Sequence, residues 1–231
     1  MTIKPGNTSA PPTRFFRILT ERKILGSMVE QLTNYLFKYY SGKDKGAGLD
    51  SIKERIAKFD SIIDDYVVKA RGNKIADRTF YTASELGDFG LLWVILAILR
   101  ALRGGKLNEK AGLRAVVATG IESTLVNVFL KSIFHRSRPV VEIEHPLPLR
   151  QPLSSSFPSG HATAAFCAAM LLAEKDDIGW FYFLLAFIVA SSRVYVRIHH
   201  SSDVIGGIFV GLLLGAIGRM LVPLRPKGRG N

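Results

Sequence analysis

A histidine and an aspartate, His199 and Asp203, stand four residues apart near the end of the chain. That spacing is one helical turn, so the Asp203 carboxylate can hold the imidazole in one tautomer and leave the other ring nitrogen free as a nucleophile. Arg193, six residues before His199, adds a planar guanidinium suited to phosphate oxygens. The competing interpretation is a partly buried His–Asp hydrogen bond with a structural role only.

A second cluster, Phe157-Pro158-Ser159-Gly160-His161, precedes an apolar stretch and predicts the start of a helix. Gly160 permits a turn that a larger residue would not easily adopt. The unpaired amides at a helix start, together with the Ser159 hydroxyl, form a site that binds anions. His161 lies beside that site, where it can exchange a proton with the bound group. An N-cap serine followed by an incidental histidine is the alternative.

Lys131 and Arg138 form a third cluster, directly before Pro139. Seven residues are two helical turns, so the spacing predicts that both cations lie on one face of a helix that Pro139 ends. Two cations converging near a membrane are costly unless they hold an anion. Basic residues at a helix end, taken alone, more often extend their charge toward water.

Together these clusters suit phosphoryl transfer, which needs positive charge around the phosphoryl oxygens and an attacking group in line with the leaving group. The cations and the helix-start amides supply that charge from the protein itself. Glu142 and Glu144 lie in a loop without further acidic partners, so we expect no Mg²⁺ site and no cofactor.

Five apolar helices must position the three clusters. We expect them at Ser84–Arg103, Ala115–Phe134, Gly160–Ala173, Ile178–Val196 and Val204–Leu221. Their uncharged stretches are short against the ~20 residues that cross a bilayer, so a soluble helical bundle is an alternative. Alanines in the third helix and five glycines in the fifth favour close packing in lipid. The predicted fold class is all-α, a polytopic membrane helical bundle of about five spans.

The N-terminal third is more polar. We expect a disordered tail over residues 1–13 and amphipathic helices over residues 14–80, then a membrane domain over 81–223 and a basic tail over 224–231. The first amphipathic helix is Phe15–Tyr40, and the second carries a stripe of Ile52, Ile56, Phe59, Ile63 and Tyr66. Both helices suit a membrane interface, and packing on each other or on a partner is equally open.

A net charge of +12 suggests an anionic membrane surface or nucleic acid as a partner. The membrane is favoured because no nucleic-acid-binding motif appears. Basic residues surround the connection Arg100–Arg114 and the tail Arg219–Arg229, which with five spans lie on one side, predicted to be cytoplasmic. The site then faces outward, as does the charged N-terminal region, for which no cleavable signal peptide is evident.

The three clusters together resemble the three-part signature of the type 2 phosphatidic acid phosphatase (PAP2) superfamily. In this sequence the parts are Lys131-x6-Arg138-Pro139, Pro158-Ser159-Gly160-His161 and Ser192-Arg193-x5-His199-x3-Asp203. The resemblance covers about Leu86 to Leu221, and a match of this kind is highly specific. It implies a bacterial membrane lipid phosphatase, independent of Mg²⁺, whose helical bundle is related to that of vanadium haloperoxidases.

The resemblance also implies roles for single residues. His199 would attack phosphorus, Asp203 would orient it, and His161 would protonate the leaving oxygen. The residues that would hold the phosphate are Lys131, Arg138, Ser159, Gly160 and Arg193.

The sequence departs from the family pattern in three places. His200 and Ser201 follow the nucleophile, where an aromatic residue and a proline are frequent, and Arg197 replaces a small residue. Arg197 would add charge near the site and favour a more anionic headgroup. Compared with six-span members, the first span is replaced by the amphipathic Phe15–Tyr40.

The predicted reaction is metal-independent hydrolysis of a phosphomonoester or pyrophosphate of a membrane lipid through a phosphohistidine. Alternatives are a vanadate-dependent haloperoxidase-like enzyme and a non-catalytic phospholipid-binding membrane protein. The expected partners are the lipid bilayer and a lipid phosphate substrate, with no nucleic acid, at a bacterial plasma membrane. The oligomeric state is left open, and so is the substrate, among phosphatidic acid, phosphatidylglycerol phosphate, polyprenyl mono- or pyrophosphate and a prenyl-linked sugar phosphate.

Overall fold

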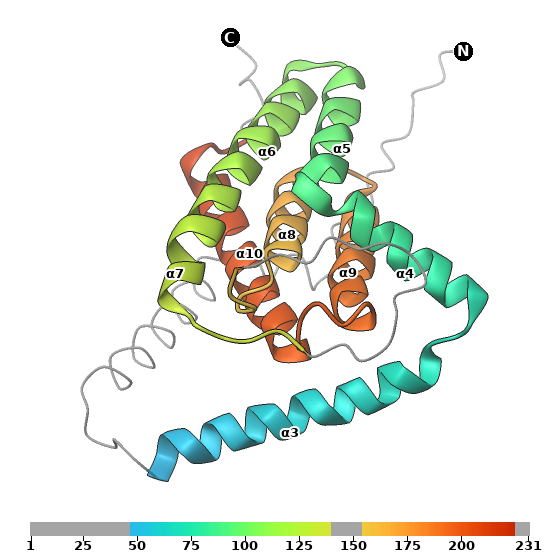
Figure 1. Ribbon diagram of the computed structural model, residues 1–231. Coiled ribbons are helices and arrows are strands. Elements are labelled where there is room, and N and C mark those ends of the chain that lie inside the picture. Colours follow the sequence, from blue (N-terminus) through green and yellow to red (C-terminus); the bar gives the residue numbers. More distant parts are fainter. Residues whose placement is uncertain (1–46, 140–153, 225–231) are drawn as a thin grey trace, which may run out of the picture. The chain divides into compact units, whose positions relative to one another are not determined.

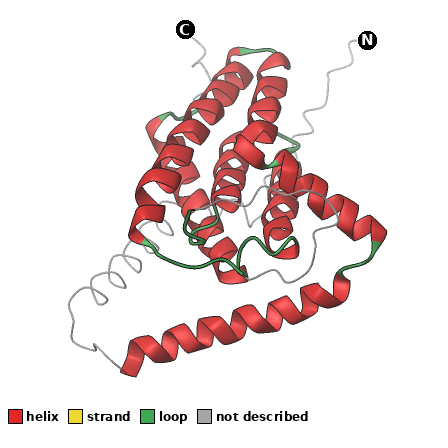
Figure 2. Ribbon diagram, viewed as in Figure 1, coloured by secondary structure: helices red, strands yellow, loops and turns green. Residues whose placement is uncertain are grey.

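The structure, a computed structural model, describes residues 47–139 and 154–224, and every regular element in those ranges is helical (Figures 1 and 2). The predicted helix Phe15–Tyr40, the predicted tail over residues 1–13 and most of the loop Arg136–Phe157 lie outside the described residues. The elements are α3 (Ala47–Ala70), α4 (Lys74–Leu86), the 3₁₀ turn η1 (Asp88–Gly90), α5 (Leu91–Leu102), α6 (Lys106–Thr124), the π-helix η2 (Leu125–Leu130), α7 (Lys131–Ile133), α8 (Gly160–Leu172), α9 (Gly179–Tyr195) and α10 (Ser201–Leu221).

The chain divides by its internal contacts into two compact units, Met1–Ile52 and Lys53–Asn231. All eight predicted site residues belong to the second unit, which is the one described below. The predicted boundaries at residues 13, 80 and 223 stay predictions.

α8 is the central helix of the bundle, with α5, α6, α9 and α10 packed around it (Figure 1). Every residue from Ala162 to Leu172 is buried, and five of these residues are alanines. Such small side chains let the backbones of neighbouring helices come close. The sequence-based range for this helix, Gly160–Ala173, is confirmed to within one residue.

α10 lies directly against α8 because glycines face the contact. A Cβ on Gly207 would stand 2.6 Å from the carbonyl oxygen of Ser159, and one on Gly211 would overlap the carbonyl oxygen of Thr163. The Ser159 amide also donates to the Asp203 carbonyl oxygen at 3.0 Å. These contacts set the register of the two helices and bring their N-terminal ends together.

The predicted helix Ser84–Arg103 is wrong as a single element, because η1 breaks it between α4 and α5. Phe89 and Gly90 in this turn have φ angles of 57° and 69°. Glycine adopts such angles readily, whereas an aromatic residue does so at a steric cost. The break places Asp88 beside His161 at the start of α8, with Asp88 Oδ1 at 2.9 Å from His161 Nε2.

The helix that carries Lys131 ends at Ile133, within one residue of the predicted range Ala115–Phe134 and well before Pro139. Phe134 already has an extended backbone, with φ −101° and ψ 128°. The prediction that Pro139 ends this helix, with Lys131 and Arg138 on one helical face, is therefore wrong. The backbone after α7 pairs instead with the chain before α8, since Arg136 accepts from the Ser156 amide at 2.9 Å.

Apolar side chains cover the outside of the bundle. On α5 the exposed residues Leu91, Ile95, Ile98 and Leu102 recur every three or four positions. Exposed apolar stripes of this kind on several helices indicate an apolar environment around the bundle. Among the described residues, two helical stretches, Lys106–Ile133 and Ser201–Leu221, are long and apolar enough to cross a membrane. The all-helical bundle is confirmed, and the number of spans stays a prediction.

The far end of the bundle, where α8 ends, holds a set of ion pairs. Its two carboxylates, Glu174 and Asp176, each lie beside two arginines. The nitrogen–oxygen distances are 2.7 Å and 3.7 Å from Arg114 and Arg219 to Glu174, and 3.6 Å and 2.7 Å from Arg100 and Arg103 to Asp176. Lys110 donates to the Pro223 carbonyl oxygen at 3.2 Å, so the start of α6 and the chain after α10 meet at this end.

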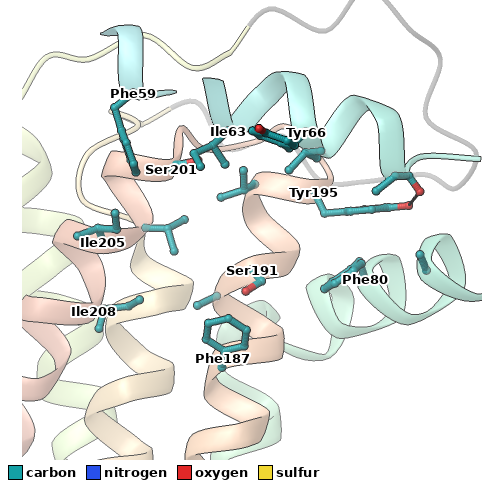
Figure 3. A pocket seen from close by; sticks show the side chains of 16 residues that line it. Phe59, Ile63, Tyr66, Phe80, Phe187, Ser191, Tyr195, Ser201, Ile205 and Ile208 are labelled. Atoms are coloured by element: carbon teal, nitrogen blue, oxygen red, sulfur yellow. Dashed lines mark hydrogen bonds between the residues drawn. The ribbon is translucent and has the colours of Figure 1, made fainter. Parts of the chain in front are cut away.

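α3 lies near the opposite end, where α10 begins. Figure 3 shows its side chains Phe59, Ile63 and Tyr66 bordering a cavity whose other walls come from α4, α9 and α10. The cavity has a volume of about 490 Å³ and an almost wholly apolar lining that extends to Ile208 of α10. The predicted stripe on this helix therefore faces apolar surroundings, but it is not closely packed.

Candidate active site

The start of α8 forms the floor of the candidate site. Ser159 is the N-cap residue, is fully buried, and its Oγ makes no hydrogen bond within the described residues. The amides in the first turn of a helix lack intrahelical acceptors and lie at the positive end of the helix dipole. Gly160 faces Asn127 and Lys131, because a Cβ there would lie 3.3 Å from Asn127 Oδ1 and 3.7 Å from Lys131 Nζ. This floor is built to receive an oxyanion.

Three cations, Lys131, Arg138 and Arg193, surround the floor. Lys131 Nζ lies 3.5 Å from Ser154 Oγ, and Arg138 Nη2 donates to the Ser154 carbonyl oxygen at 3.1 Å. Arg193 is 2% exposed and donates to the hydroxyl of Ser84. In residues 47–139 and 154–224, none of the three cations forms an ion pair with a carboxylate. The site therefore carries positive charge that only neutral groups contact.

His199 is buried between Arg138 and Asp203. Arg138 Nη1 lies 3.1 Å from His199 Nε2, and because a guanidinium only donates, Nε2 must be the unprotonated nitrogen. On the other side of the ring, Nδ1 lies 3.8 Å from Asp203 Oδ2, which is too far for a hydrogen bond. The Ser156 hydroxyl lies between them, 3.4 Å from Nδ1 and 2.5 Å from Asp203 Oδ2.

The predicted contact between His199 and Asp203 is thus made through Ser156. One arrangement of protons satisfies these contacts. Nδ1 of His199 carries the ring proton and donates it to Ser156 Oγ, and the Ser156 hydroxyl donates to Asp203 Oδ2. Burial is the main cause that lowers the pKa of His199 to about 3, and the charges of Arg138 and Arg193 act in the same direction. The imidazole is neutral near pH 7, with its lone pair on Nε2.

His161 is the second histidine of the site and has a carboxylate partner of its own. Its Nε2 lies 2.9 Å from Asp88 Oδ1 at the break between α4 and α5. The Asp88 side chain is 30% exposed, so this side of the site opens outward. A histidine held by a carboxylate at the edge of an anion site is placed to pass a proton to or from a bound group.

The structure brings the eight predicted residues to one end of the bundle, but by different means. Ser159, Gly160 and His161 arrive on the first turn of α8, as predicted. Asp203 arrives in the first turn of α10, and His199 in the turn just before it, so the two do not share one continuous helix. Arg138 arrives on an extended segment.

Several residues that contact the site were not found from the sequence. Ser156 belongs to a run of three serines before Phe157, which gave no sign of its partners. Asp88 lies in the turn that interrupts the predicted helix Ser84–Arg103, and none of the three clusters included it. Asp60 and Arg136 form a chain of hydrogen bonds to Asp203 that joins residues far apart in sequence.

Arg197 does not extend toward the site as expected. Its Nη2 donates to Asp64 of α3 at 2.7 Å, so its charge is already paired. His200, which stands where the family often has an aromatic residue, is the N-cap residue of α10, and its amide donates to Asp203 Oδ2 at 2.9 Å. In the part of the chain that the structure describes, no group of three or more His, Cys, Asp or Glu side chains is placed to bind a metal ion.

Comparison with known proteins identifies the family of this chain. The PAP2 superfamily model matches residues 111–226. A decaprenylphosphoryl-5-phosphoribose phosphatase from Mycobacterium tuberculosis is 32% identical over 140 residues, which cover 58% of this chain and 73% of that protein. The undecaprenyl-diphosphatase BcrC of Bacillus subtilis is 28% identical over 145 residues, 62% of this chain and 73% of that protein.

A solved structure has the same fold. The crystal structure of a transmembrane PAP2 type phosphatidylglycerolphosphate phosphatase from Bacillus subtilis superposes with a TM-score of 0.63 at 23% identity, covering 87% of this chain and 98% of that one. The chain belongs to the PAP2 superfamily. It is a phosphatase of that family.

Proposed function

We propose that this phosphatase hydrolyses a phosphomonoester or diphosphate of a membrane lipid, without a metal ion, through a phosphohistidine at His199. One observation carries the proposal: Lys131, Arg138 and Arg193 gather at a helix start without a carboxylate partner among the described residues, beside a neutral histidine. Asp88 and Asp203 act electrostatically on Arg193 and Arg138, but among the described residues no carboxylate forms a direct ion pair with the three cations. Positive charge of this kind can stabilise the charge on the phosphoryl oxygens in the transition state.

In the first step, Nε2 of His199 forms a bond to phosphorus while the bond from phosphorus to the lipid oxygen breaks. Arg138, which donates toward Nε2 in the free enzyme, moves its hydrogen bond to a phosphoryl oxygen as Nε2 becomes bonded. His161 enters this step as an imidazolium, which Asp88 and the bound phosphate stabilise, and it gives its proton to the departing oxygen. The imidazolium that forms at His199 is stabilised by Asp203 through Ser156.

In the second step, water attacks the phosphohistidine and the nitrogen–phosphorus bond breaks. His161, which gave up its proton in the first step, takes one from the attacking water. The products are phosphate and His199 in its neutral form, so both histidines return to their starting states.

The lipid nature of the substrate is supported by the surroundings of the site. The named relatives act on decaprenylphosphoryl phosphoribose and undecaprenyl diphosphate, which share a phosphate and a long hydrocarbon chain. In this chain, an apolar cavity of about 490 Å³ begins at Ser201, two residues before Asp203. A hydrocarbon chain beside the phosphate would find apolar surface there.

We further propose a location at the plasma membrane with the site on the outer face. Support comes from the basic far end, where Arg100, Arg103 and Lys110 gather, since basic loops favour the cytoplasmic side. A membrane domain over residues 81–223 preceded by amphipathic helices over 14–80 fits that arrangement.

The test is phosphate release from a panel of lipid phosphates in detergent, with and without EDTA. We expect equal rates in both conditions and a loss of about 10⁴-fold or more in His199→Ala, because the nucleophile is gone. Acid-labile phosphate trapped on the wild-type protein should be absent from that variant. Complete dependence on added Mg²⁺, or label retained in His199→Ala, would contradict the proposal.

A further inference from the structure

Asp60 of α3 is a buried carboxylate that has no role in the proposed mechanism. It is 6% exposed, and both of its oxygens are occupied. Oδ1 accepts from the Ser202 amide at 2.8 Å, and Oδ2 accepts from the Ser202 hydroxyl at 2.7 Å and from Arg136 Nη2 at 2.6 Å. Residue 202 directly precedes Asp203, so α3 is bonded to the turn that carries the acid of the site.

Arg136 joins Asp60 to Asp203 itself. One of its terminal nitrogens, Nη2, donates to Asp60, and the other, Nη1, donates to Asp203 Oδ1 at 2.5 Å. Asp203 Oδ2 remains for Ser156, which leads to His199. The series Asp60, Arg136, Asp203 therefore alternates in charge and ends at the oxygen that faces the nucleophile. Its net charge is −1, because the cation is shared between two carboxylates.

These polar contacts matter to the position of α3, because its apolar contacts are weak. The helix borders a cavity, and Phe59 and Tyr66 are 40% and 66% exposed. A helix without close packing is placed largely by its directed contacts, among them those of Asp60, Asp64 with Arg197 at 2.7 Å one turn later, and the Ala70 carbonyl oxygen with the Tyr195 hydroxyl at 3.2 Å. Of these two carboxylates, only Asp60 reaches Asp203 through a bridging residue.

We propose that Asp60 is a positioning residue for the phosphatase reaction, which acts through Arg136 to fix the orientation and the effective charge of Asp203. This inference rests on the proposed function. With Asp60 in place, Arg136 orients Asp203 but does not neutralise it, so the carboxylate still stabilises the imidazolium that forms at His199. Without the Asp60 charge, the full charge of Arg136 falls on Asp203.

The test compares Asp60→Asn with Asp64→Asn, two isosteric changes one turn apart on the same helix. Asparagine at position 60 keeps one oxygen that can accept from Ser202. Its amide nitrogen is a donor, so it cannot replace the oxygen that accepts from Arg136 Nη2, and that contact is lost. Small displacements of a reacting group can cost about 10²-fold in rate. We expect kcat on a lipid phosphate to fall about 10- to 100-fold in Asp60→Asn, with KM changed less than about threefold, since no group that binds the phosphate is touched. Asp64→Asn should stay within about threefold in both constants.

A double-mutant cycle checks that the effect passes through Arg136. In an Arg136→Gln background, adding Asp60→Asn should change kcat by less than about twofold, because the link is already broken. Effects that multiply would overturn the proposal, as would an Asp60→Asn variant indistinguishable from Asp64→Asn. If Asp60→Asn does not fold, Arg136→Lys addresses the same link from the other side: one ammonium cannot reproduce the two-sided guanidinium contact, so kcat should again fall 10-fold or more.

Failure of this inference can be distinguished from failure of the proposed function. Wild-type protein and His199→Ala decide whether the chain is a lipid phosphatase with a histidine nucleophile. The Asp60 variants are read only against active wild-type protein, with equal thermal midpoints as the condition for comparison.

Discussion

Both ends of the bundle hold buried arginines, but the partners of these arginines differ between the two ends. At the far end, Arg100 and Arg114 are buried beside Asp176 and Glu174, so each cation has a carboxylate within 4 Å. At the site end, Arg193 is just as buried, but its side chain contacts a serine hydroxyl and no carboxylate of the described residues.

The difference teaches what each cluster is for. A buried charge is costly unless it is compensated, so paired arginines can stabilise a fold, whereas an uncompensated one is retained at the expense of stability. The missing anion at the site end is the substrate phosphate in our proposal. The same residue type therefore has opposite expected effects on stability and activity at the two ends.

The largest expected effect separates the two ends directly. Arg193→Met keeps an unbranched side chain but removes the guanidinium and its charge, and we expect kcat/KM on a lipid phosphate to fall about 10³- to 10⁵-fold, as for other arginines that stabilise phosphoryl transfer. Its thermal midpoint in detergent should be unchanged or higher, because an uncompensated buried charge has been removed.

Arg114→Met is the matched variant at the far end. Its guanidinium donates to Glu174 and to the carbonyl oxygens of Leu171 and Val222, so its loss leaves acceptors without a donor. We expect a destabilisation of about 1–3 kcal/mol and a normal kcat per folded molecule. If both variants lost stability and kept activity, the contrast between the ends would be wrong.

His161 sharpens the comparison, because it lies at the site end beside a carboxylate, Asp88. As a general acid it should matter most for a poor leaving group. His161→Ala should lower kcat on a lipid phosphate about 10²- to 10⁴-fold. With p-nitrophenyl phosphate, whose leaving group hardly needs a proton, formation of the phosphohistidine should be largely spared.

Trapping of acid-labile phosphate measures this effect. Label should build up in His161→Ala when p-nitrophenyl phosphate is the substrate, since the water in the second step also needs His161. Equal losses on both substrates, without accumulated label, would show that His161 does not act on the leaving oxygen.

The smallest expected effect is that of pH on His199. Arg138, Arg193, Ser156 and Asp203 face the ring, and burial together with the two arginines sets its pKa at about 3. Titration of this residue should therefore change kcat/KM by less than about threefold between pH 6.5 and pH 5. An ordinary histidine with a pKa of about 6.5 would change kcat/KM more than tenfold over the same range.

Stability should show the opposite sensitivity. The pKa of His199 is lower in the folded chain than the value of about 6.5 in the unfolded chain. The unfolded chain therefore takes up the proton first, and the contribution of neutral His199 to stability is present above pH 6.5 and is lost as the pH falls toward 3. Thermal midpoints at pH 7 and pH 5 should differ less in His199→Gln than in the wild type. An equal difference would place the pKa of His199 near its ordinary value.

Local patterns in the sequence were sufficient for the elements whose cause is local. The start of α8 follows from Ser159 and Gly160 before an apolar stretch, and α9 was found to within one residue at each end. The glycines of α10 indicated close helix packing, which the contact of Gly207 with Ser159 confirms. Local patterns did not predict the features that depend on residues far away in the sequence. The turn η1 interrupts an apolar run, and the chain after α7 leaves the helix and pairs with residues 155 and 156.

By itself, the sequence determined the helical class and the family, and it supplied the chemistry proposed for the site and the residues proposed to perform it. Residue types and short spacings carry that information, because a nucleophile, its acid and a helix start are recognisable within a few positions. Only the tertiary structure decided that Ser156 stands between His199 and Asp203, and that Arg136 joins Asp203 to Asp60 of α3. Residues 60, 136 and 203 lie on three segments whose meeting no periodicity predicts, since it follows from how the helices pack together and not from the neighbours of each residue along the chain.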